Sequence, residues 1–538
     1  FNWAPGFFSG CPIILLNMKK IHLSIYLILL TVHVFAQKHD NWWITIAPGL
    51  DNDPTHAPFP SSYLCFDFSP PHETFWQNPF PGDAMYLTMS NQNGDAIFYS
   101  NAYNIYHMNG ELIDNGSGIT EDTFPAWYPF SPPMPMAMMG LPRPNHEDDY
   151  YILHLEGGPG FFERRRLILT LITGATGPQA GSVAFKNKAL IDNGHWLEFF
   201  QATRHANGRD WWVVASDADS VTQLRTFYTF FLGADTAYLA HTQLFDGYEP
   251  VPPAWYNWTF QRVFTPDGKY LITLDLNNGI RIHPFDRCTG LLGELLTLPY
   301  QRNGLGGVAV APNSRFLYAN TDAEIFQYDL WADDIAATLD TVAVFDGFVD
   351  AVTQVPTFFP RPALAPDGKI YYFANFLYGH YISRPNKKGL ACDVRQHALQ
   401  LPTYFFAPPY YPNYRLGPLD GSSCDTLGLN NEPLADFWWF GDSTLSVEFA
   451  DNSSYEPSEW HWDFGDGGTS QDTSPVHLFP APGVYTVCLT VSNPYAADTV
   501  CKPVTVTAST GIPALIRPES FPLSITPNPA DEQIVVRW

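Results

Sequence analysis

The sequence predicts an all-β protein, in which a β-propeller of six or seven blades is followed by an immunoglobulin-like β-sandwich. Aromatic residues make up 16% of the 538 residues, and the 39 glycines and 48 prolines suit short strands joined by frequent turns. A turn motif recurs at intervals of about 50 residues, as the blades of a propeller do. Nearer the C-terminus, an aromatic segment with period-two alternation runs into a glycine-rich turn. A chain of this length is expected to fold as two or more domains.

The N-terminal region has the features of a secretory signal peptide. Residues 18–36 contain two lysines after a methionine, then an apolar stretch, then small residues at the expected cleavage site after Ala36. The mature protein is therefore expected to begin at Gln37. Residues 1–17 precede the signal and are interpreted as upstream translation. An uncleaved membrane anchor is the alternative, which the shortness of the apolar stretch disfavours.

The propeller is predicted over residues 37–424. Its evidence is a repeated pair, Asn or Asp followed by Gly or a polar residue, just ahead of an aromatic or aliphatic strand. Such pairs tolerate positive φ and form tight hairpins. A hairpin recurring at this spacing is typical of propellers with four-stranded blades, and unrelated hairpins in two sandwiches are the alternative. The clear copies are residues 93–94, 207–208, 267–268, 313–314 and 367–368, with a degenerate copy at 147–148.

Two of these hairpins carry a family resemblance. The segments Phe264-Thr-Pro-Asp-Gly-Lys-Tyr-Leu and Leu364-Ala-Pro-Asp-Gly-Lys-Ile-Tyr resemble hairpins of WD-repeat-like and lactonase-like bacterial propellers. The resemblance covers the hairpins and not whole blades. An early strand near Trp42 is expected to close the ring with strands from the C-terminal end of the propeller.

A second domain is predicted over residues 433–507, after a polar linker at 425–432. Its segment Trp460-His-Trp-Asp-Phe-Gly-Asp-Gly, followed by the alternating strand Gly483-Val-Tyr-Thr-Val-Cys-Leu-Thr-Val, resembles the PKD (polycystic-kidney-disease) domain. The resemblance implies a small β-sandwich on an extracellular protein and implies no particular activity.

The C-terminal region begins with a linker at 508–522. Residues 523–538 then contain Pro-Asn-Pro-Ala and an alternating strand. This resembles the opening of the C-terminal sorting domain of type IX secretion in Bacteroidetes, of which only the start is present. The resemblance implies that the type IX secretion machinery is a partner and that the sorting domain is truncated.

Seven cysteines are present, and Cys11 falls upstream of the signal, so six would remain after export. An even number suits disulfides in an oxidising compartment. Cys488 and Cys501 lie in consecutive strand-like segments and are expected to bridge across a hairpin. The sequence alone leaves open the pairing of the other four, which are Cys65, Cys288, Cys392 and Cys424.

No catalytic residues, metal ligands or cofactor are predicted. The formal charge of −26 disfavours nucleic acid and anionic membrane surfaces as partners, and no membrane insertion is expected after signal cleavage. The metalloprotease, nucleophile-elbow and P-loop motifs are absent from the sequence. The polar residues of 204–210 are expected to hold a hairpin tip, and the acidic run 147–149 to form a solvated turn. Asp463 and Asp466 are expected to bond the amides of their own turn rather than calcium.

Aromatic, proline-rich loops are the candidate ligand-binding feature. Their rings could stack on sugars or grip extended peptides, and packing between blades is the alternative. The residues singled out are Trp127, Tyr128, Trp255 and Trp258.

The sequence therefore predicts a secreted or outer-cell-surface interaction protein without catalytic activity. Its propeller is expected to present a binding face for a glycan or a protein, and the ligand is expected to be a neutral or cationic polymer such as a glycan. The alternatives are a propeller enzyme acting on a glycan, lactone or peptide, and a purely structural spacer. A cluster of His and carboxylate groups at the centre of the ring would favour the enzyme.

Overall fold

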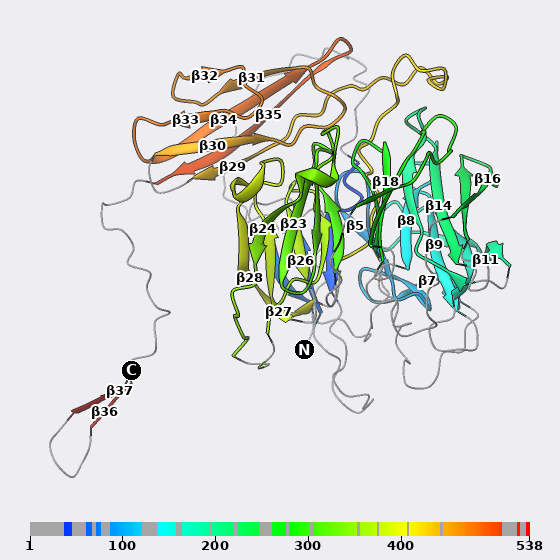
Figure 1. Cartoon of the computed structure of the whole chain (residues 1–538), viewed down its shortest axis with the longest axis horizontal. Helices are drawn as coiled ribbons and strands as arrows, with labels where there is room; N and C mark the ends of the chain where they lie inside the picture. Colours follow the sequence, from blue (N-terminus) through cyan, green and yellow to red (C-terminus); the bar gives the residue numbers. More distant parts are fainter. Residues whose placement is uncertain are drawn as a thin grey trace. The chain divides into compact units, whose positions relative to one another are not determined.

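The computed structural model describes two compact units (Figure 1), one of residues 1–434 and 454–456 (unit 1) and one of residues 435–453 and 457–538 (unit 2). It describes residues 37–537 except 46–60, 67–71, 77–86, 121–136, 158–163, 194–195, 219–223, 247–260, 276–278, 299, 301–305, 352–353, 355, 374–375, 406–407, 442–444, 508–523 and 528–533. The expected signal peptide and upstream segment lie outside the described residues.

The described residues are almost entirely strands and turns. Their helices are two short 3₁₀ segments, η2 (Ala336–Thr338) and η3 (Gly389–Cys392). No helix in the described part of the chain is both long and apolar enough to span a bilayer. The all-β prediction is confirmed.

Unit 1 begins with a three-stranded sheet. It continues as antiparallel four-stranded meanders, of which the described residues contain six. The first sheet is β1 (Trp42–Thr45), β2 (Ser61–Cys65) and β3 (His72–Trp76). Two meanders follow: β4 (Leu87–Ser90), β5 (Ala96–Ser100), β6 (Asn104–His107) and β7 (Leu112–Ser117), then β8 (Met138–Pro142), β9 (Tyr150–Gly157), β10 (Arg164–Thr173) and β11 (Ser182–Asp192). A parallel contact between β7 and β11 joins these two into one sheet.

The third meander has an interrupted first strand. Its strands are β12 (Trp196–Leu197) and β13 (Gln201–Arg204), which both pair with β14 (Trp211–Ala218), and then β15 (Arg225–Leu232) and β16 (Ala237–Phe245). The fourth is β17 (Gln261–Phe264), β18 (Tyr270–Asp275), β19 (Gly279–Pro284) and β20 (Leu296–Leu298). The last two are β21 (Gly307–Val310), β22 (Phe316–Asn320), β23 (Glu324–Asp329) and β24 (Asp340–Val344), then β25 (Arg361–Leu364), β26 (Ile370–Phe373), β27 (Phe376–Ile382) and β28 (Val394–Phe405).

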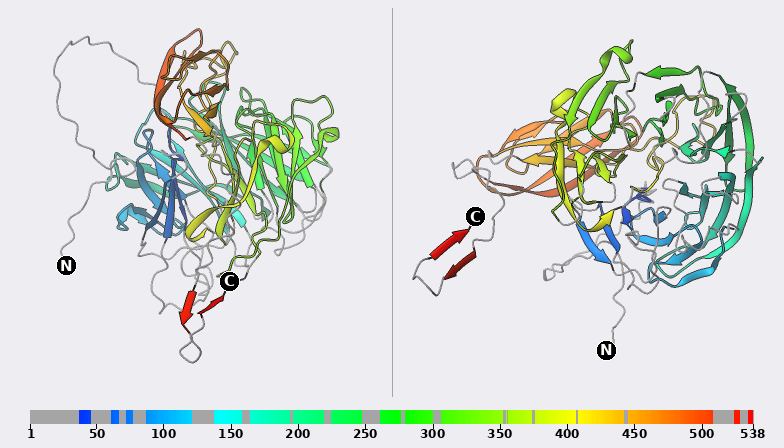
Figure 2. Two further views of the ribbon diagram at one scale, coloured as in Figure 1. Left: turned by 90° about the vertical axis from the view of Figure 1, so that its left-hand side faces the viewer. Right: turned by 60° about the horizontal axis from the view of Figure 1, so that its bottom comes forward.

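These sheets form a ring, which Figure 2 shows in its right-hand view. The first strands of successive meanders contact one another: β4 with β8, β13 with β17, β17 with β21, and β21 with β25. First strands that meet in this way line the centre, as in a propeller. The propeller prediction is therefore confirmed, and the number of six or seven blades stays a prediction.

The repeated turns occupy equivalent places, as predicted. Each clear copy joins the first and second strands of a meander, and its second residue has positive φ. The φ values are 95° at Gly94, 76° at Gly208, 72° at Gly268, 60° at Ser314 and 73° at Gly368. The spacing of the motif thus reports the spacing of the blades.

The three-stranded sheet packs against the last meander. Trp43 is 1% exposed and contacts the rings of Tyr371 and Phe373 on β26 edge-to-face. On its other side, β1 contacts β4. The N-terminal strands therefore sit between the first and last meanders. The early strand near Trp42 takes part in closing the ring, but in the described residues it pairs with β2 in a sheet of its own and not with C-terminal strands.

The centre of the ring is occupied by the chain itself. Residues 408–419, here called the plug, follow β28 and run among the first strands (Figure 2). Tyr414 is 1% exposed and donates a hydrogen bond of 2.7 Å to the carbonyl of Gly140 on β8. Tyr410 donates to the carbonyl of Arg262 on β17. Buried hydroxyls paired in this way join the plug to separate blades.

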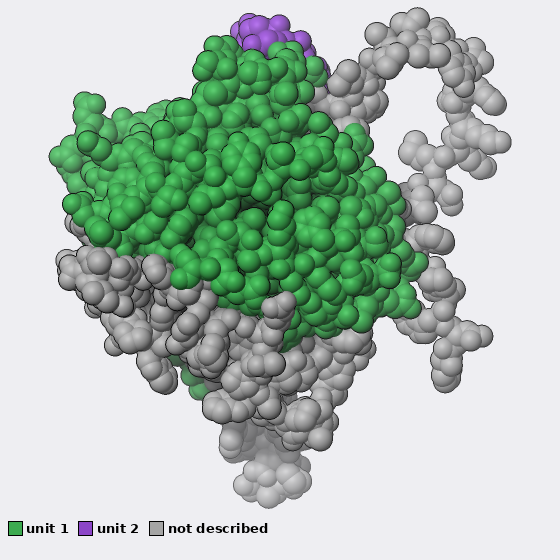
Figure 3. All heavy atoms as spheres, turned by 90° about the vertical axis from the view of Figure 1, so that its right-hand side faces the viewer, with its two compact units in different colours: residues 1–434, 454–456 green, residues 435–453, 457–538 purple. Residues whose placement is uncertain are grey.

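Unit 2 (purple in Figure 3) is a sandwich of two antiparallel sheets. One sheet is β29 (Phe437–Gly441), β30 (Ser446–Asp451) and β33 (Val476–Leu478), and the other is β32 (Thr469–Ser470), β31 (Glu459–Asp463), β34 (Gly483–Ser492) and β35 (Ala497–Val506). Trp462 and Phe464 are buried between them with Phe449. Further along the chain, β36 (Ser524–Pro527) pairs with β37 (Ile534–Arg537).

The aspartates of the PKD-like motif bond their own turn, as expected. Asp463 accepts a hydrogen bond from the amide of Gly465, and Asp466 accepts one from the amide of Gly468. The second oxygen of Asp466 lies 2.8 Å from Nε2 of His477. These carboxylates are therefore used to shape the turn.

The predicted disulfide between Cys488 and Cys501 is present. The two residues are cross-strand partners on β34 and β35, with Cα atoms 4.1 Å apart. Of the cysteines whose pairing the sequence left open, Cys288 is joined to Cys424 and Cys392 is a buried free thiol.

Replacing Cys488 and Cys501 together with serine is expected to lower the stability of unit 2 by about 2–3 kcal/mol, because the bridge restricts the unfolded chain. Calorimetry of the whole chain would detect this as a lower unfolding temperature for unit 2. The control is Thr490→Ala with Thr499→Ala, a neighbouring cross-strand pair joined by one hydrogen bond of 2.8 Å. Equal shifts for both double variants would contradict a role for the bridge.

Candidate functional site

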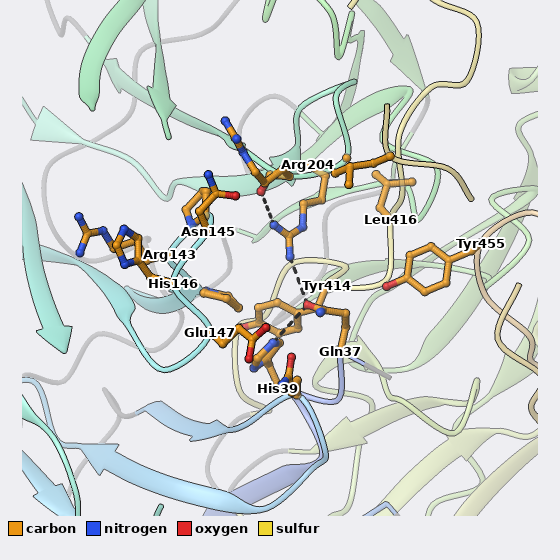
Figure 4. Close-up of a pocket in the computed structure, with 16 residues that line it drawn as sticks. Gln37, His39, Arg143, Asn145, His146, Glu147, Arg204, Tyr414, Leu416 and Tyr455 are labelled. Atoms are coloured by element: carbon orange, nitrogen blue, oxygen red, sulfur yellow. Dashed lines mark hydrogen bonds between the residues drawn. The ribbon is translucent and has the colours of Figure 1, made fainter. Parts of the chain in front are cut away.

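A cavity of 210 Å³ opens on unit 1 at one end of the plug (Figure 4). It lies on the face formed by the turns between first and second strands. Three such turns contribute to it: β4–β5 through Gln92, β8–β9 through residues 142–147, and β13–β14 through Gly208 and Arg209. The plug contributes Tyr414 and Leu416, and the segment before β1 contributes Gln37 and His39.

The segment before β1 is fixed along the β4–β5 turn. The amide of Lys38 donates to the carbonyl of Gln92, and the amide of Ser90 donates to the carbonyl of His39. Nδ1 of His39 lies 2.8 Å from the carbonyl oxygen of Ser90. Backbone pairing therefore carries Gln37 and His39 into the cavity.

His39 is a neutral, structural histidine. Burial lowers its pKa to about 3, and the ring packs edge-to-face on Tyr150 and Tyr414. Because a carbonyl oxygen only accepts, the ring proton resides on Nδ1, and Nε2 is left as an acceptor. Nε2 faces the side-chain oxygen of Gln37 at 3.3 Å.

Arg204 is the central charged group of the cavity. It is 7% exposed, and burial lowers the pKa of its guanidinium to about 10, so the group is still protonated at neutral pH. The guanidinium stacks on Trp211 at 3.7 Å from the ring centre. It donates to the carbonyl of Arg209 and, over 3.4 Å, to the side-chain oxygen of Gln37.

The rim arginines are paired with aspartates. Arg143 contacts Asp149 at 2.9 Å and Asp235 at 2.7 Å, and Arg209 contacts Asp210 at 2.8 Å. Both arginines therefore have a carboxylate at ion-pair distance, whereas Arg204 has none among the described residues.

The polar residues of 204–210 hold a hairpin tip, as the sequence analysis expected. Asn207 donates to Asp210, and the ring of His205 packs against Trp212 and Phe231. Nδ1 of His205 accepts the amide of Asn207. His205 therefore acts as a turn-stabilising group.

A second buried polar cluster lies between the third and fourth meanders. Its members are Glu198, between β12 and β13, Ser216 on β14, Arg225 on β15 and Arg262 on β17. Glu198 is 5% exposed, and its carboxylate lies 2.8 Å from Nη2 of Arg225 and 3.4 Å from Nη2 of Arg262. Ser216 donates to Glu198 and accepts from Arg262. Arg262 also donates to the carbonyl of Phe199. This cluster therefore links the third and fourth meanders through ion pairs and hydrogen bonds.

The predicted ligand-binding residues Trp127, Tyr128, Trp255 and Trp258 lie outside the described residues, so their role stays a prediction. Among the described side chains, no three His, Cys, Asp or Glu residues come together as a group able to hold a metal ion.

Sequence reasoning identified Arg204 only as part of a hairpin tip. It missed Gln37, His39 and Tyr414 as members of a site. Their separation along the chain leaves no local pattern. The signal available in the sequence was that Arg204 and Trp211 lie on either side of the Asn207-Gly208 turn.

Comparison with known protein families gives a match in the C-terminal part of the chain. Residues 441–508 match the PKD domain family. The PKD1 domain of Vibrio anguillarum Epp is 30% identical, and the match covers 15% of this chain and 100% of that one, with a TM-score of 0.14.

Other solved structures are similar over the larger part of the chain. A functionally unknown protein from Desulfotomaculum acetoxidans is 13% identical over 69% of this chain and 99% of its own, with a TM-score of 0.38. The Dos1 propeller is 10% identical over 69% of this chain and 83% of its own, with a TM-score of 0.40. No curated protein matches.

Proposed function

We propose that this chain is a secreted or cell-surface interaction protein whose propeller binds a ligand without transforming it. The observation that carries the proposal is the plug. Where the first strands converge, these polar groups of the plug form hydrogen bonds and ion pairs within the protein. Tyr410 and Tyr414 donate to backbone carbonyls, and Arg415 forms a bidentate ion pair with Asp40 at 2.7 and 3.0 Å.

Acid–base chemistry needs a group that can exchange a proton near neutral pH. At this centre, His39 has a pKa of about 3, and burial raises the pKa of Tyr414 well above its usual value. Neither group is suited to that exchange. This supports binding over the alternative of a propeller enzyme.

The PKD domain and the two disulfides between described residues are compatible with an extracellular protein. The finer parts of the proposal rest on sequence. They are export through the signal at 18–36, type IX secretion in a member of the Bacteroidetes, and a glycan ligand held by Trp255 and Trp258.

A glycan array with the whole chain tests this function. We expect a neutral or cationic glycan to be retained and then recovered unchanged, as mass spectrometry would show. Trp255→Ala and Trp258→Ala are expected to weaken its retention, because a lost sugar–aromatic stack removes apolar contact. Recovery of a cleaved product would favour the enzyme, and an array without any retained glycan would overturn the glycan proposal.

A further inference from the structure

We infer that the cavity at the end of the plug binds a small carboxylate, with Arg204 as its charged anchor. The site is additional to the proposed glycan surface, and its ligand is an acid rather than a neutral or cationic polymer. The volume of 210 Å³ is below the range of about 300–1,000 Å³ that suits drug-sized ligands. It therefore suits one small group, such as a single sugar acid.

Among the described residues, Arg204 has no carboxylate hydrogen-bond partner. Its partners there are the Arg209 carbonyl and the Gln37 amide, its plane stacks on Trp211, and its Nε has no partner in this part of the chain. A buried charge costs free energy unless it is paired and hydrogen-bonded. A bound anion would supply the missing opposite charge.

Charged neighbours of both signs act on Arg204. Burial is the main cause of its lowered pKa, the charge of Asp210 raises that pKa, and the charge of Arg287 lowers it. Arg287 donates to three backbone carbonyls, those of Arg204, His205 and Gly417. The net charge of −26 repels anions from the molecule as a whole, so anion binding here depends on direct contact with the guanidinium of Arg204.

Gln37 is a poor permanent partner for the guanidinium. Its Oε1 faces both Nη2 of Arg204 at 3.4 Å and Nε2 of His39 at 3.3 Å. Arg204 requires an acceptor there, whereas neutral His39, with its proton on Nδ1, requires a donor. Either orientation of the amide leaves one of the two contacts unsatisfied.

A carboxylate on Arg204 would resolve this conflict. The amide of Gln37 could then turn its nitrogen toward His39, and both buried groups would have a partner. Figure 4 shows the three side chains gathered at the centre of the cavity, with Gln37 between the other two.

Glu147 provides an internal check on the charge argument. It is exposed and is the one acidic side chain among the described residues that line the cavity. Its charge opposes an anionic ligand, so Glu147→Gln should strengthen carboxylate binding. Because the residue is exposed, this change is not expected to disturb folding.

Calorimetric titration of the whole chain with D-glucuronate, D-glucose and inorganic phosphate tests the inference. We expect glucuronate to bind and glucose not to bind. Arg204→Gln should weaken glucuronate at least about tenfold, because a charge-assisted hydrogen bond is lost. Glu147→Gln should strengthen it about two- to fivefold, as expected for one nearby charge. Arg315→Gln is the matched control, since Arg315 lies at the equivalent turn of another blade and pairs with Asp329 at 2.7 Å.

Unchanged glucuronate affinity in Arg204→Gln would overturn the inference, as would a wild-type chain that binds neither anion. Binding of phosphate without glucuronate would overturn the carboxylate assignment. If Arg204→Gln fails to fold, Glu147→Gln decides, and an unchanged or weaker affinity in that variant overturns the proposal. These outcomes are separate from the glycan array, which probes the Trp255 and Trp258 loop.

Discussion

Replacing Glu198 with leucine is expected to lower the free energy of unfolding of unit 1 by about 3–5 kcal/mol. The change removes the carboxylate that lies between Arg225 and Arg262, both of which are at most 1% exposed. Two buried guanidinium groups would then lose the carboxylate that they share. Urea unfolding of the whole chain, followed by tryptophan fluorescence, measures the loss.

Two further variants make this test specific. Glu294→Leu, at an exposed position, is the control and should change stability by no more than about 0.5 kcal/mol. Adding Arg225→Met and Arg262→Met to Glu198→Leu should recover part of the loss, because an apolar cluster can replace a buried ionic one. If Glu198→Leu alone were as stable as the wild type, the cluster would not stabilise the contact between the two blades.

Removing the bridge between Cys288 and Cys424 is expected to have an effect of similar size. The two residues are 136 positions apart, and a loop of that length corresponds to about 4–5 kcal/mol in the chain-entropy description. The double variant Cys288→Ser, Cys424→Ser should therefore unfold unit 1 at a clearly lower urea concentration. The bridge ties the turn after β19 to the chain just beyond the plug.

The short bridge of unit 2 is the control for this second prediction. Cys488→Ser with Cys501→Ser should leave the transition of unit 1 unchanged. If loss of the Cys288–Cys424 bridge lowers the free energy of unfolding of unit 1 by less than about 1 kcal/mol, the prediction is wrong. Other contacts would then restrict residues 417–424 in the unfolded chain even without the bridge.

The features that the sequence predicted are those with a local physical cause. A positive φ at Gly268 or Gly368 requires a residue that tolerates it, so the hairpins could be found from single turns. Cys488 and Cys501 could be paired because they lie in adjacent strands of one hairpin. Asp463 and Asp466 bond amides two residues away, which is again a local relation.

The features that the sequence did not predict depend on closure of the ring. Tyr414 meets Gly140 across 274 positions, and Cys288 meets Cys424 across 136. Neither pair leaves a periodic pattern. The burial of Glu198 with two arginines also looks, in sequence, like ordinary surface charge, because charged residues are seldom fully buried.

The position of the three-stranded sheet has a consequence for how fast unit 1 can fold. The sheet β1–β3 packs between the first and last meanders, and the plug comes from the opposite end of the same unit. The entropy cost of loop closure comes before these distant segments form stabilising contacts, and this order slows folding. Hairpins can form early because their turns are local. The last contacts of the ring form only after the sheet β1–β3 and the plug have both docked on the meanders. Until then, the apolar surface that Trp43 covers on β26 is open to contact with other chains, so the slow step is also the step at which aggregation competes with folding.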